Sequence, residues 1–389
     1  MSKGLTRSLQ RELNSFFSEV QETDYSISEV TKGALTHARK KLKPEAFKEL
    51  NQEALRSFYQ GAPWLKWRGH RVLACDGSTI VLPKHPTTTE EFGVHRFGSK
   101  ADSENCMARI SLLYDVLNLT TLDSQLGKYV TSERELLNNH LAQTAFENQD
   151  LLLVDRGYAG IALMHELQQK GIAFCMRLPD SWNEVRQMME NDEKDKLVTF
   201  KLPALYRKQI KMEGKEDRDI SCRIVVIDFP DGSKEVLCTS LTDTNKYKYE
   251  CFKELYHYRW GVEENYKLLK CQASLEAFSG KSAQAVKQDF FAKVFMISMC
   301  AILSFPIDQK VKTEYNAAVD KYAKQINRTN ALSIVKETWL GMFLKRFLYV
   351  PLAAIDDILT RTCDIIRPNR RFKRKKRLKK PPFMNYKQL

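Results

Sequence analysis

The spacing of apolar residues along the chain changes at about residue 70. Before this point apolar residues recur every three or four positions, as in amphipathic helices; they are Leu5, Leu9, Leu13, Phe16 and Phe17. We therefore predict a helical N-terminal region over residues 1–68. Inside it, residues 26–29 (Ser-Ile-Ser-Glu) fit a capping box, Gly33 offers a turn, and residues 35–42 fit a second helix.

These two short helices have the outline of a helix-turn-helix, whose second helix reads the major groove of DNA. The second helix would expose four basic side chains: His37, Arg39, Lys40 and Lys41. A plain helical cap fits the same pattern, because helical hairpins are common outside DNA-binding proteins. The sequence leaves both interpretations of this region open.

From residue 70 onward, strand-like and helix-like segments alternate. The predicted strands are 71–82, 107–118, 120–130, 151–155 and 172–178, and the predicted helices are 133–145 and 161–169. A strand, a helix and a further strand in this order imply parallel pairing with a crossover connection. The fold class is therefore α/β.

The alternation breaks at about residues 180–245, where a charged stretch precedes three strand-like segments, 197–200, 222–229 and 234–240. We interpret these residues as a β-rich insertion within a domain that spans residues 69–310. Helical patterns dominate afterwards and predict a C-terminal helical region over residues 311–366. The apolar run 294–305 stops at Pro306 and is too short to span a bilayer, so we expect a buried helix and no membrane partner.

The charge of the chain is concentrated at its C-terminal end. The 389 residues carry a formal net charge of +14, with 43% hydrophobic and 28% charged residues, which is typical of a globular protein of two or three modules. Residues 367–389 contain 11 Lys and Arg and no acid, which leaves about +3 for the rest of the chain. Such a basic tail suits a polyanion, because binding releases condensed counterions. A solvated tail or an import-like signal is the alternative.

The number and spacing of the cysteines indicate the cellular compartment of the protein. Nine are scattered along the chain without a Cys-x-x-Cys pair, which argues for reduced thiols and against a disulfide framework or a zinc site. The first residues lack the apolar segment of a signal peptide. We therefore expect a cytoplasmic protein, associated with the nucleoid if the basic tail binds DNA.

Two aspartates stand where an α/β sheet usually places its site. Asp155 ends a buried strand and is followed by Arg-Gly-Tyr, and Asp76 lies in a strand beside Gly77. Carboxylates at strand ends, next to a glycine that lets a ligand approach, are typical of such sites. The alternative for each residue is that the carboxylate caps a turn.

A third candidate segment runs from Tyr256 to Lys270. On a continuous helix with about 100° per residue, Tyr256, Arg259, Glu263 and Lys270 share an arc of roughly 60°. Four apolar residues would seat this helix on the core: Leu255, Tyr258, Val262 and Leu269. A surface ion pair between Arg259 and Glu263 is the alternative, but it leaves the shared face of Tyr256 and Lys270 unexplained.

The pattern Tyr-x2-Arg-x3-Glu-x6-Lys, with the earlier Asp-Gly-Ser at Asp76 and Asp-Arg-Gly-Tyr at Asp155, resembles the DDE transposases of bacterial insertion sequences, in particular the IS-four-type group. The resemblance covers most of the chain. It implies an RNase H-like core, a mixed sheet flanked by helices. It also implies two Mg²⁺ ions, for which Mn²⁺ can substitute, held by Asp76, Asp155 and Glu263 with Asp76 bridging both.

The implied activity is cut-and-paste transposition, in which hydrolysis at the element ends frees a 3′-hydroxyl that attacks target DNA. The implied partners are double-stranded terminal repeats, target DNA and a second copy of the chain. Arg259 and Lys270 would hold phosphates and Tyr256 would stack or hydrogen-bond beside them. In the basic tail, the DNA-binding candidates are Arg371, Arg374 and Lys376. A nuclease or resolvase without strand transfer and a non-enzymatic DNA-binding protein are the alternatives.

Overall fold

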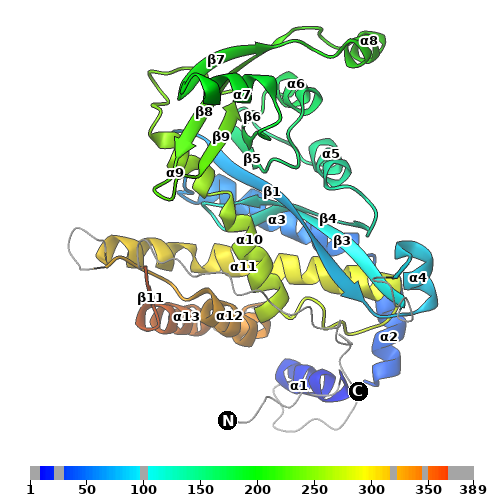
Figure 1. The fold of residues 1–389 in the computed structure, drawn as a ribbon. Helices are drawn as coiled ribbons and strands as arrows, with labels where there is room; N and C mark the ends of the chain where they lie inside the picture. Colours follow the sequence, from blue (N-terminus) through cyan, green and yellow to red (C-terminus); the bar gives the residue numbers. More distant parts are fainter. Residues whose placement is uncertain (1–8, 22–29, 97–103, 316–321, 344–348, 367–389) are drawn as a thin grey trace. The chain divides into compact units, whose positions relative to one another are not determined.

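The computed structural model describes residues 9–21, 30–96, 104–315, 322–343 and 349–366 (Figure 1). By its internal contacts the chain divides into two compact units. One, here called the helical unit, comprises residues 1–61, 79–108 and 267–389, and the other, here called the sheet unit, comprises residues 62–78 and 109–266. The module boundaries at residues 68, 310 and 366 stay predictions.

The sheet unit is built on a mixed sheet in which the neighbouring strands follow the order β3-β1-β5-β6-β9-β8-β7, with β4 paired to β3. The strands are β1 Arg71–Leu82, β3 Glu104–Asp115, β4 Thr120–Lys128, β5 Asp150–Val154, β6 Ala173–Arg177, β7 Asp195–Phe200, β8 Ile220–Asp228 and β9 Lys234–Thr239. The strands β1, β5 and β6 are parallel, and β9, β8 and β7 continue the sheet in antiparallel pairs. This arrangement confirms the predicted α/β class and the mixed sheet flanked by helices.

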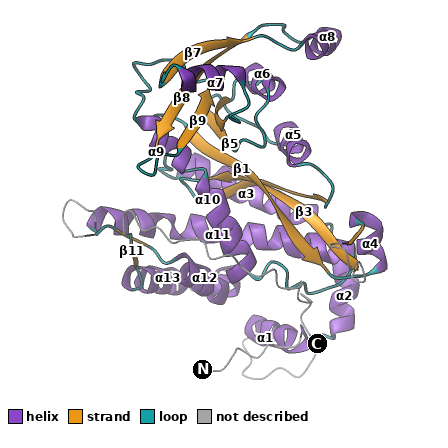
Figure 2. Cartoon of the chain, in the orientation of Figure 1, coloured by secondary structure: helices purple, strands orange, loops and turns teal. Residues whose placement is uncertain are grey.

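The parallel centre of the sheet is covered on both faces. Every residue of β5 is buried, as expected of a central parallel strand. Helix α5 (Glu133–Gln143) packs on β4, and helix α6 (Ile161–Gln169) packs on β6 and β8 (Figure 2). Asp76 lies in the middle of β1, and Asp155 directly follows β5, in this covered part of the sheet.

The segment predicted as a β-rich insertion forms all three expected strands, β7, β8 and β9, because β9 pairs with β6 and extends the central sheet. It also forms two short helices that the sequence pattern did not indicate, α7 (Asn183–Glu190) and α8 (Ala204–Met212). In α8 only Ile210 is buried. A helix with so small a buried face needs few apolar residues, so its sequence gives little of the periodic apolar pattern from which helices are predicted.

The helical unit is organised around one long helix. Its elements are α1 Leu9–Gln21, α2 Lys32–Lys41, α3 Glu45–Gly61, α4 Pro86–Phe92, β2 Val94–Arg96, the π-helical η1 Leu268–Gln272, α11 Ala283–Glu314, β10 Lys324–Gln325, α12 Arg328–Phe343, α13 Tyr349–Arg361 and β11 Asp364–Ile365. Helix α11 contacts α3, α12 and α13. The rings of Phe58 in α3 and Phe305 in α11 meet edge to face with centroids 5.2 Å apart.

Helix α11 corrects one prediction. The apolar run 294–305 lies in a buried helix, as predicted, but the helix is longer than the run: it begins at Ala283 and continues through Pro306 to Glu314. By length and composition alone α11 could cross a membrane. Its residues Phe290, Val294 and Ile297 are nevertheless buried against the neighbouring helices, as in the core helix of a globular domain.

Helix α2 corrects a second prediction. Thr31 caps it, with Thr31 Oγ1 accepting a hydrogen bond from Ala34 N at 3.1 Å, so the helix begins at Lys32 and Gly33 lies inside it instead of forming a turn. Residues 26–29, the predicted capping box, lie outside the described residues. His37, Lys40 and Lys41 are exposed as expected, but Arg39 is not, because its guanidinium is bound to α11.

Candidate active site

Asp76 and Asp155 lie on neighbouring parallel strands of the sheet unit. Strand β1 pairs with β5 so that Ala74 stands opposite Leu153, and the same offset places Asp76 level with Asp155. Each carboxylate is turned onto the backbone beside it. Asp76 Oδ1 accepts from Gly77 N and Asp155 Oδ1 from Gly157 N, both at 2.8 Å. The sheet therefore brings the two aspartates to one edge.

Two tyrosines connect the segment around Glu263 to these strand ends. Tyr256, at the end of α9 (Cys251–His257), donates its hydroxyl proton to Val154 O at 3.4 Å. Tyr266, in α10 (Trp260–Lys267), donates to Asp76 O at 2.8 Å. Glu263 lies between them in sequence, in α10, so the Tyr266 contact holds its helix against β1, while the Tyr256 contact holds the preceding helix α9 against the end of β5.

The continuous helix predicted over Tyr256 to Lys270 is wrong. The chain turns at Tyr258 and Arg259 between α9 and α10, and the π-helical η1 follows at Leu268. A uniform 100° per residue therefore does not hold across the segment, because a π-helix closes each turn with an i→i+5 bond. Such short π-helical turns are frequent at functional sites.

Lys270 shows the effect of this π-helical turn. It belongs to the helical unit, where its Nζ donates to Thr79 O at 2.8 Å. Burial lowers the pKa of its ammonium group. The lysine is therefore directed at the backbone of β1, three residues after Asp76 in sequence.

Arg259 is the cation of the site. Its side chain is 9% exposed, and its Nη2 lies 3.0 Å from Glu263 Oε1. The guanidinium also lies over the ring of Trp260, with 4.6 Å from Cζ to the ring centroid, and near the ring of Tyr256. Within the described residues, Arg259 Nε is buried and has no hydrogen-bond partner.

The electrostatics of Asp76 connect the members of the site. The pKa of this carboxyl is raised to about 6, mainly by burial and to a lesser extent by the negative charges of Asp155 and Glu133. The Gly77 N–H and the Arg259 guanidinium act in the opposite direction. Asp76 therefore lies close enough to Asp155, Glu133 and Arg259 to interact with each.

Glu133 and Trp260 were missed by the sequence reasoning. Glu133 opens α5, whose start was predicted, but no local signal connects that helix with Asp76. Trp260 is 39% exposed and lines an open groove of about 480 Å³ together with Tyr256, His257 and Phe229. An exposed indole beside an arginine is a surface on which a nucleic-acid base can stack. Its place directly after Arg259 was the available sequence signal.

The donor chemistry of the site suits a hard divalent cation. Asp76, Asp155 and Glu263 offer carboxylate oxygens, which Mg²⁺ prefers, and the negative charge of Asp155 beside Asp76 is charge that a cation would neutralise. In the described part of the chain, no group of three or more His, Cys, Asp or Glu side chains is already arranged to hold a metal ion. One reason is that Glu263 is paired with Arg259.

Three predicted DNA-binding residues, Arg371, Arg374 and Lys376, lie outside the residues that the structure describes. Their role stays a prediction from the charge of the tail.

Comparison with known proteins gives one family match. Residues 67–300, more than half of the chain, match the family model described as "Transposase DDE domain". The matched range contains all three candidate carboxylates.

One curated relative and two solved structures are similar to the chain. Transposase InsG for insertion sequence element IS4 of Escherichia coli (strain K12) is 24% identical over 271 residues, which cover 67% of this chain and 58% of that protein. A piggyBac transposase synaptic complex with hairpin DNA has a TM-score of 0.40 at 10% identity, covering 74% of this chain and 57% of that one. A pre-cleavage Mos1 transpososome has a TM-score of 0.17 at 12% identity, covering 70% and 82%. The chain thus spans little more than half the length of its curated relative.

Proposed function

The chain belongs to the transposase DDE domain family, and from this premise we propose that it catalyses cut-and-paste DNA transposition. One observation supports the proposal: Tyr256 and Tyr266, which flank Glu263 in sequence, donate hydrogen bonds to Val154 O, at the end of the strand before Asp155, and to Asp76 O. On this basis we assign Glu263 to one site with Asp76 and Asp155, although the three carboxylates come from distant parts of the sequence.

In this proposal Asp76, Asp155 and Glu263 would hold two Mg²⁺ ions, which Mn²⁺ could replace. Two bound ions would activate the attacking oxygen and stabilise the leaving oxygen of an in-line displacement. Glu263 is paired with Arg259 in the structure, so this ion pair would have to open before Glu263 could serve as a ligand. The released guanidinium then holds a phosphate beside the scissile bond, which suits its planar set of donors.

The reaction proceeds in two displacements. Water first breaks a P–O bond at the element end and leaves a 3′-hydroxyl. This hydroxyl then attacks a phosphodiester of the target, forming one new P–O bond and releasing a 3′-hydroxyl on the target strand. Tyr256 orients the end of β5 through Val154, and Lys270 orients β1 through Thr79. A contact of either residue with DNA requires a change from these partners.

The experiment uses labelled terminal-repeat DNA, a target plasmid and Mg²⁺. Joined products are expected from the wild type, and cleavage without joining favours the alternative, a nuclease or resolvase. Asp76→Ala, Asp155→Ala or Glu263→Ala should each reduce cleavage by at least about 10³-fold, because several kcal/mol of transition-state stabilisation depend on the metal. Glu264→Ala is the matched control on the exposed side of α10. Wild-type cleavage by any of the three variants would refute the assignment.

The basic tail supplies DNA affinity in this proposal, with Arg371, Arg374 and Lys376 on backbone phosphates and two copies of the chain pairing two element ends. Deletion of residues 367–389 should weaken binding to DNA of any sequence and flatten its salt dependence, since about 0.9 counterions are released per neutralised phosphate. Filter binding at several salt concentrations measures the slope. An unchanged slope would show that the tail makes no DNA contact.

A further inference from the structure

The first turn of helix α5 lies between the two aspartate segments. Glu133 and Arg134 are consecutive residues of this turn. One reaches the backbone beside Asp76 and the other reaches the loop after Asp155. Neither residue belongs to the Tyr-Arg-Glu-Lys pattern or to the two Asp-containing motifs.

Arg134 fixes the loop that follows Asp155. Its Nε donates to Gly157 O at 2.8 Å and its Nη2 donates to Ala159 O at 2.9 Å. The N–H of the same Gly157 donates to Asp155 Oδ1. The peptide groups of Gly157 are therefore held by the carboxylate on one side and by the guanidinium on the other, which restricts the direction of the Asp155 side chain.

The side chain of Glu133 lies against strand β1 at Gly77, next to Asp76. A Cβ atom added to Gly77 would lie 2.6 Å from Glu133 Cγ and 2.7 Å from its Oε1, so a larger residue at position 77 would have to displace the Glu133 side chain. Arg109 Nη1 lies 3.1 Å from Glu133 Oε1 and keeps it in place. The turn therefore contacts β1 directly beside the carboxylate of Asp76.

The turn itself is firmly anchored. Ser132 caps α5, with its Oγ accepting from Glu135 N at 3.1 Å. Further along the helix, the buried ring of His140 lies 3.0 Å from Ser111 Oγ of β3 and 2.7 Å from Asp123 Oδ2 of β4. Because the helix is held at its cap and along its buried face, it can keep the two segments that it contacts in fixed positions.

We propose that the first turn of α5 positions the two aspartates of the site, Arg134 by holding the loop after Asp155 and Glu133 by closing against Gly77 beside Asp76. The inference rests on the proposed function and goes beyond it, because it adds two positioning residues outside the family's motifs. Outer contacts that orient a metal ligand typically change metal affinity or activity by about 10–100-fold.

The test measures Mn²⁺ binding to the full chain without DNA, by electron paramagnetic resonance, together with cleavage of terminal-repeat DNA. Arg134→Gln should weaken Mn²⁺ binding and cleavage by about tenfold, at the lower end of the range for such contacts. Arg134→Lys should fail to restore either, since an ammonium group cannot bridge two carbonyls as the planar fork does. Retention of DNA and the midpoint of thermal unfolding should stay at the wild-type values.

Glu133→Gln is the second variant, and it should also weaken Mn²⁺ binding because the neutral amide loses the ion pair with Arg109 that holds residue 133 against Gly77, while the side chain keeps its size. Glu135→Gln, in the same turn and exposed, is the matched control and should bind Mn²⁺ like the wild type. Full activity of Arg134→Lys, or a loss of DNA retention in step with cleavage, would overturn the inference, because Arg134 would then act as a charge on DNA.

Asp155→Ala separates this inference from the proposed function. If Asp155→Ala loses Mn²⁺ binding while Arg134→Gln and Glu133→Gln keep it, the positioning role is wrong and the metal site stands. If Asp155→Ala binds Mn²⁺ like the wild type, the metal site itself is wrong and the positioning role falls with it. Loss of Mn²⁺ binding in all three variants, with an unchanged unfolding midpoint, supports both.

Discussion

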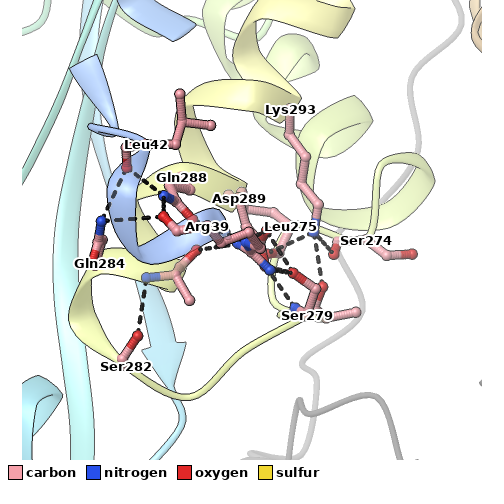
Figure 3. Close-up of polar contacts among 12 residues, drawn as sticks. Arg39, Leu42, Ser274, Leu275, Ser279, Ser282, Gln284, Gln288, Asp289 and Lys293 are labelled. Atoms are coloured by element: carbon pink, nitrogen blue, oxygen red, sulfur yellow. Dashed lines mark hydrogen bonds and ion pairs between the residues drawn. The ribbon is translucent and has the colours of Figure 1, made fainter. Parts of the chain in front are cut away.

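Two arginines of this chain sit in polar clusters of opposite character. Arg39, in the helical unit, uses its whole guanidinium: Nε donates to Gln288 at 3.0 Å, Nη1 to Ser279 at 2.6 Å and Nη2 to Asp289 at 3.0 Å (Figure 3). Arg259, in the sheet unit, has one ion pair, with Glu263, and its buried Nε has no partner within the described residues.

The surroundings of the two arginines differ in the same way. Gln284 and Gln288 donate to the backbone carbonyls of Arg39 and Leu42, which satisfies the C-terminal end of α2. Beside Arg259, by contrast, the carboxyl of Asp76 is held at a raised pKa. A network in which every polar group has a hydrogen-bond partner stabilises one arrangement of side chains. A network that leaves a buried donor without a partner is more typical of a site that binds a ligand. The contrast is between an arginine whose donors all have partners and one that keeps a buried donor without a partner among the described residues.

The largest expected effect is on catalysis at Arg259. Arg259→Ala should lower the rate of DNA cleavage by about 10²–10³-fold, because it removes a preorganised cation from the developing charge. Arg259→Lys should recover only part of the rate, because lysine lacks the planar fork. Single-turnover cleavage measures both. An unchanged rate in Arg259→Ala would place this arginine with Arg39 among the structural ones.

The next effect is on stability at Arg39. Arg39→Ala should lower the free energy of unfolding by about 2–3 kcal/mol, less than for a fully buried pair, because the Arg39 side chain is 23% exposed. Urea denaturation measures the change, and a double-mutant cycle with Asp289→Asn should show coupling between the two residues. Cleavage per folded molecule should match the wild type. A cleavage defect without loss of stability would contradict the structural assignment of Arg39.

The smallest effect concerns the pH dependence of stability at Asp76. The pKa of this carboxyl is about 6 in the folded protein against 3.8 as the ordinary value, so the folded state binds the extra proton between these values. The unfolding free energy contributed by Asp76 therefore falls as pH rises through this window and stays low above it.

Asp76→Asn removes this dependence. Relative to the wild type without metal, the variant should gain about 1–2 kcal/mol between about pH 4 and about pH 8, below the full value for two pH units because Asp76 is only partly buried. Chemical denaturation at a series of pH values tests the gain. If the unfolding free energy depends on pH in the same way in the wild type and in Asp76→Asn, the burial of Asp76 does not lower the stability of the folded protein.

The sequence by itself predicted the elements whose pattern is local. The strand at residues 71–82 and the helix at residues 161–169 have the predicted bounds, because apolar spacing and glycine positions mark them directly. Asp76 and Asp155 could be placed on strands from the same signals. The motif around Glu263 could be identified because its residue types and spacing are specific, even though the helix that carries it is interrupted.

Only the tertiary structure decided which distant groups meet. The break at Tyr258 and the π-helical turn at Leu268 could not be predicted from residue spacing, and neither could the hydrogen bonds of Tyr256 to Val154 O and of Tyr266 to Asp76 O. Arg39 has the same charge as Arg259, and the basic sequence of its helix predicts a surface position for it. Its partner Asp289 is 250 positions away in sequence, so the ion pair could not be predicted from the local pattern. Local patterns fix backbone conformation over a few residues, whereas burial and pairing depend on the whole chain, so roles such as those of Arg39 and Glu133 are determined by the fold.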